Sequence, residues 1–105
     1  MTEPSAKQAL NAALELFHRR WTLRILWDLR GPALTFRDLQ AAAGEISASV
    51  LSQRLAELRE ALLVEHAGAG YELSAQGRAL LVAFEPLQRW AVPWARAVAR
   101  SRPGA

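Results

Sequence analysis

Apolar residues between positions 35 and 62 recur at helical spacing, with a single interruption. Thr35 stands three residues before an acid, the spacing of a hydroxyl N-cap, so a helix is predicted over residues 36–43. Gly44 ends it, because glycine adopts the left-handed conformation of a helix terminus without strain. Ser47 is the next N-cap, and a second helix follows with an apolar stripe at spacings of 4, 3 and 4: Leu51, Leu55, Leu58 and Leu62. Residues 35–62 therefore form a helix-turn-helix pattern, the unit that presents its second helix to DNA.

The face of the second helix opposite this stripe carries small or uncharged side chains, namely Ser49, Ser52, Gln53 and Ala56. Hydroxyl and amide groups of this size can approach base edges and phosphates closely, whereas a face built for solubility more often carries Glu and Lys. The alternative interpretation is that these serines only cap an ordinary helix start. From these residues alone, both interpretations stay open.

The segment that follows, residues 63–74, has the pattern of a short β-hairpin. Residues 62–66 are β-prone, residues 67–70 read Ala-Gly-Ala-Gly and predict a tight turn, and residues 71–74 alternate between apolar and polar. A helix-turn-helix followed by a hairpin is a winged helix. The predicted fold class is thus mostly α with a small β-hairpin wing.

The two ends of the chain each predict a helix with a narrow apolar seam, over residues 5–19 and 75–100. The first seam runs Leu10, Leu14, Phe17 and Trp21, and the second runs Leu80, Phe84, Leu87, Ala91, Trp94 and Val98. Pro86 and Pro93 are expected to bend or restart the last helix. Seams at both ends of a small chain suggest a twofold dimer. The predicted dimer interface is Leu10, Leu14, Phe17, Phe84, Leu87, Trp90 and Trp94.

A separate helix over residues 21–30 is apolar on more than one side and is closed by Gly31 and Pro32. Ile25, Leu26 and Leu29 lie on one side, with Leu23 and Trp27 on another. A helix that is apolar most of the way round lies in the middle of a structure. It is expected between the helix-turn-helix and the terminal helices.

Composition places the chain among single-domain proteins of the cytoplasm. Its 105 residues fit one domain, 1–105, without Cys and without an apolar run near the roughly 18 residues that span a bilayer. The first four residues lack the features of a secretory signal. The net charge is +3, and twelve of the thirteen basic residues are Arg, which suits phosphate and guanine but also follows from GC-rich coding. We expect no membrane association and no disulfide.

Catalytic and metal chemistry have little support in the sequence. Nucleophilic catalysis needs a Ser or Cys beside a positioned base, yet Cys is absent and the serines stand at helix starts. There is no phosphate-binding glycine loop, and His18 and His66 lack carboxylates at ligand spacing. We therefore expect no enzyme activity, no metal site and no cofactor.

In this order of elements, the chain resembles the HxlR-type winged helix-turn-helix regulators of the MarR-like superfamily. Residues 21–26, WTLRIL, are similar to the family's KWTLLIL segment, with Arg20 in place of Lys. Gly31-Pro32 followed by Phe36-Arg37-Asp38-Leu39 resembles its G-P…F-x-E-L stretch. Residues 46–58, ISASVLSQRLAEL, resemble its recognition helix IS-x-x-x-L-T-x-R-L-x-x-L, and residues 71–78, YELSAQGR, resemble Y-x-L-T-x-x-G-R.

The resemblance implies a homodimeric bacterial transcription factor, most simply a repressor, that binds a pseudo-palindromic operator. It places Ser47, Ser49, Ser52, Gln53 and Arg54 on the segment that enters the major groove. The Gln53 amide can pair bidentately with adenine, and the serines suit phosphate or water-mediated contacts. Arg54 suits a phosphate or an internal ion pair equally well. Arg37 and Arg20 are candidates for contacts to the flanking backbone, with plain solvation as the alternative.

The chain departs from the family pattern in two places. The hairpin tip lacks a basic side chain, so minor-groove contact by the wing is doubtful. Without Cys, either a signal is sensed without a thiol or the protein acts constitutively. An aromatic small molecule is one candidate effector, in a pocket formed by Trp90, Trp94, Trp21 and Trp27, although packing is the more usual role of Trp at seam positions. The alternative function is a winged-helix scaffold that binds a protein or an aromatic small molecule without specific DNA binding.

Overall fold

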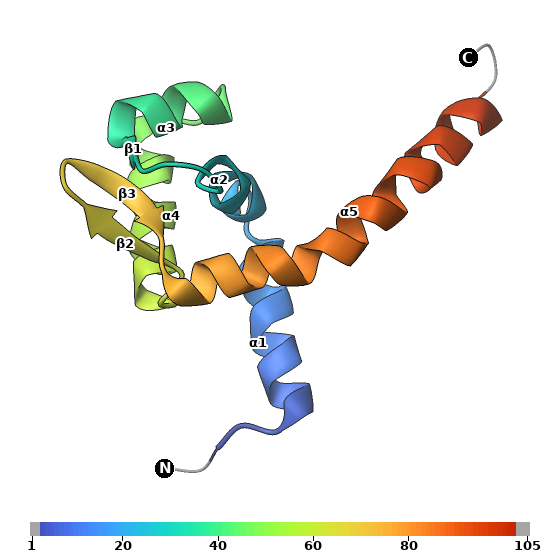
Figure 1. Cartoon of the computed structure of the whole chain (residues 1–105), viewed down its shortest axis with the longest axis horizontal. Coiled ribbons are helices and arrows are strands. Elements are labelled where there is room, and N and C mark those ends of the chain that lie inside the picture. The colour runs from blue at the N-terminus through green and yellow to red at the C-terminus, as the bar shows by residue number, and fades with distance from the viewer. Residues whose placement is uncertain (1–2, 103–105) are drawn as a thin grey trace.

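The computed structural model describes residues 3–102, and residues 1–2 and 103–105 of the predicted domain lie outside the described part (Figure 1). Its elements are α1 (Ala6–His18), α2 (Thr22–Asp28), β1 (Leu34–Thr35), α3 (Phe36–Ala43), α4 (Ala48–Glu60), β2 (Val64–Ala67), β3 (Gly70–Leu73) and α5 (Ala75–Ser101). The fold class is the expected one, mostly α-helical with a small β-wing. None of the described helices combines the length and apolarity needed to cross a bilayer.

The hydrophobic core lies between α2, α3, α4 and the wing. Helix α2 contributes the fully buried side chains of Ile25 and Leu26 to this core, and its C-cap residue contributes that of Leu29. The remaining core residues are Leu39, Ala43, Ile46, Leu51, Leu55, Leu58, Val64 and Leu73. Helix α2 was predicted to be buried between the helix-turn-helix and the terminal helices. The side of α2 that faces α3 is buried as predicted, whereas Leu23 and Trp27 on another side are 41% and 40% exposed. The core therefore holds the helix-turn-helix against one flank of α2.

Local capping sets the starts of both helices of the helix-turn-helix as the sequence predicts. The Thr35 hydroxyl accepts a hydrogen bond from the Asp38 amide at 3.1 Å, and the Ser47 hydroxyl accepts one from the Val50 amide at 3.2 Å. Gly44 ends α3 with φ 95° and ψ −111°. The positive φ suits glycine, although the ψ value places Gly44 outside the left-handed helical region that we expected.

The prediction that Leu62 extends the buried stripe of α4 is wrong. Helix α4 ends at Glu60, and Leu62 has a φ of 65° and is 69% exposed. The Leu62 amide donates to the Arg59 carbonyl and the Leu63 amide donates to the Leu58 carbonyl, both at 3.0 Å. These two bonds form a Schellman motif, with leucine at the position that usually holds glycine. The chain thereby reverses to enter β2, and this reversal turns Leu62 away from the core.

Trp21 was expected on the apolar seam of the first helix, and this prediction is also wrong. Helix α1 ends at His18, and Trp21 is the N-cap of α2 with a left-handed φ of 78°. Its side chain is half-buried against the core. The sharp corner between α1 and α2 therefore removes Trp21 from the seam.

The wing is a three-stranded antiparallel sheet in the order β1-β3-β2, one strand more than the predicted hairpin. Ala67 pairs with Gly70, so the turn is confined to residues 68–69, and Gly68 has a φ of 58°. Strand β1 pairs through Leu34 with Tyr71 and through Thr35 with Gly70. A Cβ atom on Gly70 would overlap the Leu34 carbonyl oxygen. Glycine at this position is what allows β1 to join the sheet.

Parts of helices α1 and α5 project beyond this core (Figure 1), while Leu16, Leu80 and Leu81 pack against it. The Cα radius of gyration is 16.0 Å, against about 13 Å for a compact domain of 100 residues. Helix α1 contains no buried residue, and Gly77 is the only buried residue of α5. The two helices meet where the rings of Phe17 and Phe84 pack edge to face, with centroids 5.6 Å apart.

Helix α5 continues through Pro86 and Pro93 but changes direction part-way along its length (Figure 1). Each proline removes one amide donor and leaves the carbonyl four residues earlier without its helical partner. The expected bend is therefore confirmed, and the alternative of a second, restarted helix is not what the structure shows.

Candidate nucleic-acid interface

The apolar stripe of α4 fixes which side of the helix faces solvent. Leu51, Leu55 and Leu58 are at most 2% exposed, so they anchor the helix in the core. The side chains on the other face, Ser49, Ser52, Gln53 and Ala56, are all exposed. No described part of the chain covers this polar face, so it is open to a large partner.

Ser47 is mainly structural. Its hydroxyl oxygen accepts the Val50 amide and lies 3.4 Å from the Ser49 hydroxyl oxygen. Capping uses the hydroxyl oxygen only as an acceptor, so the Ser47 hydroxyl proton can be donated either to Ser49 or to an external acceptor. Ser47 therefore combines capping with a polar surface at the start of α4.

A side chain of α3 holds the turn between the two helices. The Gln40 amide nitrogen donates to the Ile46 carbonyl at 3.2 Å, and Ile46 itself is only 4% exposed. An apolar anchor and a hydrogen bond thus act on the same turn residue. They set the angle at which α4 leaves α3.

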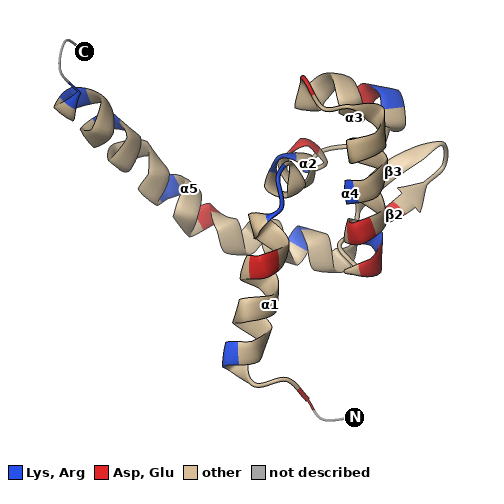
Figure 2. Cartoon of the chain, turned by 180° about the vertical axis from the view of Figure 1, so that it is seen from behind, with Lys and Arg blue, Asp and Glu red and all other residues tan. Residues whose placement is uncertain are grey.

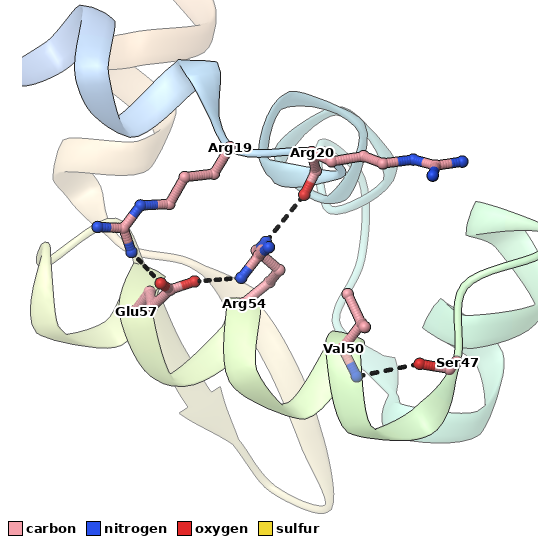
Figure 3. A network of polar contacts seen from close by, with 6 residues as sticks. All are labelled: Arg19, Arg20, Ser47, Val50, Arg54 and Glu57. Atoms are coloured by element: carbon pink, nitrogen blue, oxygen red, sulfur yellow. Dashed lines mark hydrogen bonds and ion pairs between the residues drawn. The ribbon is translucent and has the colours of Figure 1, made fainter.

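Arg37 and Arg20, the two arginines expected to contact the DNA backbone, lie on different elements, and both are exposed. Arg37 lies in the first turn of α3, and the Arg20 guanidinium stacks over the Trp21 ring, 5.2 Å from its centroid. In Figure 3 the Arg20 side chain points away from Arg54, while its carbonyl oxygen points toward it. Figure 2 shows acidic and basic segments interspersed over the core, so α4 itself carries no strongly basic stretch.

Arg54 is held inside the protein by two hydrogen bonds. Its Nη1 donates to Glu57 Oε1 at 2.8 Å, and its Nε donates to the Arg20 carbonyl at 2.8 Å. Only 18% of the Arg54 side chain is exposed. Of the two roles considered for Arg54, the geometry favours the internal ion pair over a phosphate contact.

Arg24 is a structural residue of the site that the sequence reasoning missed. Its Nη2 donates to the Ala42 carbonyl at 2.8 Å, and its Nε pairs with Asp28 Oδ2 at 3.0 Å. The Asp28 side chain is only 7% exposed, so the pair is shielded from solvent on one side. Arg24 thereby fastens the end of α3 to α2. The spacing of four residues between Arg24 and Asp28 was the available signal.

The tip of the wing is neutral, as its sequence requires, and carries only Gly68 and Ala69 in its turn.

The two histidines lie on different elements. The ring of His66 lies on Tyr71, with centroids 4.7 Å apart, and His18 is in the last turn of α1. Within residues 3–102, no three His, Cys, Asp or Glu side chains gather in a metal-binding group.

The four tryptophans do not line one pocket within a protomer. Trp90 and Trp94 stack on each other along α5, with centroids 5.4 Å apart, and are 56% and 52% exposed. Trp27 lines a separate hollow of about 190 Å³ between α2 and α5, and Trp21 packs against the core. The Trp90 and Trp94 rings already fill the space between them. A planar ligand can therefore stack only on their outer faces.

An exposed polar helix held by a helix-turn-helix, with a short wing beside it, defines a winged-helix DNA-binding protein. Residues 16–99 match the profile of the HxlR-like helix-turn-helix family. The chain belongs to this family of transcriptional regulators, which is not a class of enzymes.

Individual relatives agree with this assignment. The uncharacterized HTH-type transcriptional regulator YvaP of Bacillus subtilis (strain 168) is 28% identical over 89 residues, which cover 78% of this chain and 82% of the relative. The quinone-bound structure of YodB from B. subtilis is 30% identical, covers 79% of this chain and 94% of its own, and has a TM-score of 0.75. A MarR-family regulator from Enterococcus faecalis V583 is 26% identical over 95% of this chain and 97% of its own, with a TM-score of 0.77.

Proposed function

We propose that this regulator acts as a homodimeric repressor that binds a pseudo-palindromic operator, with α4 of each protomer in the major groove. The observation that carries the proposal is the open polar face of α4, set opposite a fully buried leucine stripe. A protein that used this helix only for packing would have no need of uncharged hydrogen-bonding side chains along its exposed side. Occupation of a promoter by such a dimer blocks transcription in the cytoplasm.

The proposed dimer rests on the apolar surface of α1 and α5. Leu10, Leu14, Leu87, Trp90 and Trp94 are each more than half exposed. Large apolar side chains at this density favour burial against a partner, and twofold symmetry brings α1 and α5 of a second copy to the same surface. Phe17 and Phe84, which were predicted in the same interface, are half-buried against each other and hold α1 and α5 together within one protomer.

Within each half-site, the proposed contacts divide by chemistry. Gln53 offers both an amide donor and a carbonyl acceptor, the pair of groups that matches the major-groove edge of adenine. Ser47, Ser49 and Ser52 suit phosphates and bridging waters, and Arg37 and Arg20 suit the backbone on either side. Arg54 stays with Glu57 in this scheme.

The proposed repressor senses its signal without a thiol, because its 105 residues include no Cys. One solved relative, YodB, was crystallised with a quinone, a planar molecule. By analogy, a planar aromatic effector that stacks on the outer faces of Trp90 and Trp94 would alter the dimer surface of α5. By altering this surface, such an effector would change the distance between the two α4 helices of the dimer and so the binding of DNA.

An electrophoretic mobility shift with the DNA upstream of the protein's own gene tests the proposal. A repressor shifts this fragment in preference to random DNA of equal length, and its affinity falls steeply as salt rises. A winged-helix scaffold would show no preference between the two fragments, and that result would refute the proposal.

The Gln53→Ala substitution should reduce the preference for the operator over random DNA by roughly 1–3 kcal/mol, because one bidentate base contact is lost. Affinity for random DNA should change little. Arg37→Ala is the matched comparison, since loss of a phosphate contact weakens all sequences alike and lowers the salt slope by about one. Titrations of both variants against both DNAs would check this. Equal losses on operator and random DNA for Gln53→Ala would contradict the readout role.

A further inference from the structure

Glu57 lies at the centre of a polar network that joins three parts of the chain (Figure 3). Its Oε2 pairs with Nη1 of Arg19, the C-cap of α1, and its Oε1 accepts the Nη1 donor of Arg54 at 2.8 Å. Arg54 Nε then donates to the carbonyl of Arg20, at the corner before α2. Both oxygens of one carboxylate are thus occupied, each by a different arginine.

The two inner side chains of the network are largely shielded from solvent. The side chains of Glu57 and Arg54 are only 20% and 18% exposed, while Arg19 is 49% exposed and forms the outer edge. Screening by water and salt is weaker for the two inner groups than for a pair on an open surface. Charge-assisted hydrogen bonds are also directional, so they hold the atoms in one arrangement.

The corner that the network reaches has a fixed shape. Arg19 is extended with ψ 132°, and Trp21 holds a left-handed φ of 78°, a conformation that non-glycine residues adopt only when their surroundings impose it. The Arg20 carbonyl lies between these two residues. The hydrogen bond from Arg54 to this carbonyl therefore fixes α4 relative to the corner between α1 and α2.

Hydrophobic packing alone does not set this position. The leucine stripe decides which side of α4 faces the core, but burial of apolar area is non-directional and tolerates small rotations and shifts along the axis. Glu57 lies one turn after Gln53 on α4. A rotation at Glu57 would therefore move the polar face by a similar angle.

We propose that Glu57 is a positioning residue for DNA recognition, which fixes α4 relative to the end of α1. This inference rests on the proposed function: if α1 forms part of the dimer contact, the network sets the separation and angle of the two α4 helices. Glu57 thereby determines which spacing between half-sites the dimer accepts. It does so without touching DNA.

Selection from a pool of duplexes with about 30 random base pairs, long enough for two successive half-sites, tests the proposal. The wild-type protein should enrich paired half-sites at one spacing. The Glu57→Gln variant should enrich the same half-site sequence at mixed spacings, because the neutral amide cannot hold both arginines. The affinity ratio between the best spacing and one changed by two base pairs should fall by at least about fivefold, since charge-assisted hydrogen bonds are lost.

Glu60→Gln is the matched control. Glu60 lies on the same helix and lines the same shallow hollow as Arg19 and Glu57, but it makes none of the ion pairs found within residues 3–102. The control removes the same charge and should keep the wild-type spacing. If Glu57→Gln does not fold, Arg54→Lys replaces it, because lysine keeps the charge but has no second nitrogen for the Arg20 carbonyl.

Three results would overturn the inference. One is an unchanged spacing preference in Glu57→Gln or Arg54→Lys, and another is an equal loss of affinity at all spacings, which indicates a role in stability alone. The third is distinct: if the wild-type protein enriches no paired half-sites, the proposed function itself fails, and the inference fails with it.

Discussion

Leu14→Glu should convert the protein to a folded monomer whose operator affinity is roughly 100-fold lower, or weaker still. Leu14 is 56% exposed on α1, a helix with no buried residue, so the substitution removes nothing from the core. A charge at this position would be buried without a partner at the proposed dimer surface, which is strongly unfavourable. A monomer then binds one half-site at a time and loses the gain from linked binding. Sedimentation analysis and DNA titration would measure both effects.

Leu62→Glu is the matched control for this experiment. Leu62 is 69% exposed and lies two residues beyond the end of α4, beside the α5 N-cap Ser74, but it is not one of the residues of the proposed dimer surface. The same Leu-to-Glu change there should leave the protein dimeric. A Leu14→Glu protein that sediments and binds DNA as the wild type does would contradict the proposed interface.

Leu51→Ala should lower the free energy of unfolding by about 2–5 kcal/mol, because it leaves a cavity in the centre of the core. Leu51 is fully buried and lies two residues before the proposed base contact, Gln53. In a domain this small, such a loss is a large part of the total stability. Urea denaturation monitored by tryptophan fluorescence would give the value.

Glu60→Ala, at an exposed position of the same helix, should change the unfolding free energy by no more than about 0.5 kcal/mol. The contrast between the two variants tests the orientation of α4 independently of DNA. Similar losses for Leu51→Ala and Glu60→Ala would mean that α4 is not held as described.

The starts of the two helices of the helix-turn-helix were predictable because their signals are local. Thr35 and Ser47 each accept the amide three residues later, and these spacings are legible in the sequence. The stripe of Leu51, Leu55 and Leu58 gave the orientation of α4 for the same reason. Each of these features depends on a window of a few residues.

The features that were missed depend on distant parts of the chain or on conformations that break a local rule. Strand β1 has only two residues and exists because Gly70 leaves room for the Leu34 carbonyl. Leu62 and Trp21 both take positive φ values, which sequence patterns assign to glycine. Periodicity therefore extended each helical seam by one apolar position beyond the end of its helix.

The candidate site shows the same division. The polar face of α4 followed from spacing alone, whereas the role of Arg54 did not, because one of its two acceptors is the Arg20 carbonyl, 34 residues earlier in the chain. The spacing of three residues between Arg54 and Glu57 was visible, but the contribution of Arg19 was not. Only the folded structure brings these arginines to one carboxylate.

The most direct test of the proposed DNA-reading face uses the absence of cysteine. Ser52→Cys introduces a unique thiol on the exposed side of α4, and Ser101→Cys introduces one at the far end of α5 as a reference. The measurement is the rate of thiol alkylation with and without saturating operator DNA. We predict that DNA protects the thiol at position 52 in proportion to the bound fraction and leaves the thiol at position 101 reactive. Equal alkylation rates at position 52 in free and bound protein would contradict the central claim that this face of α4 reads DNA.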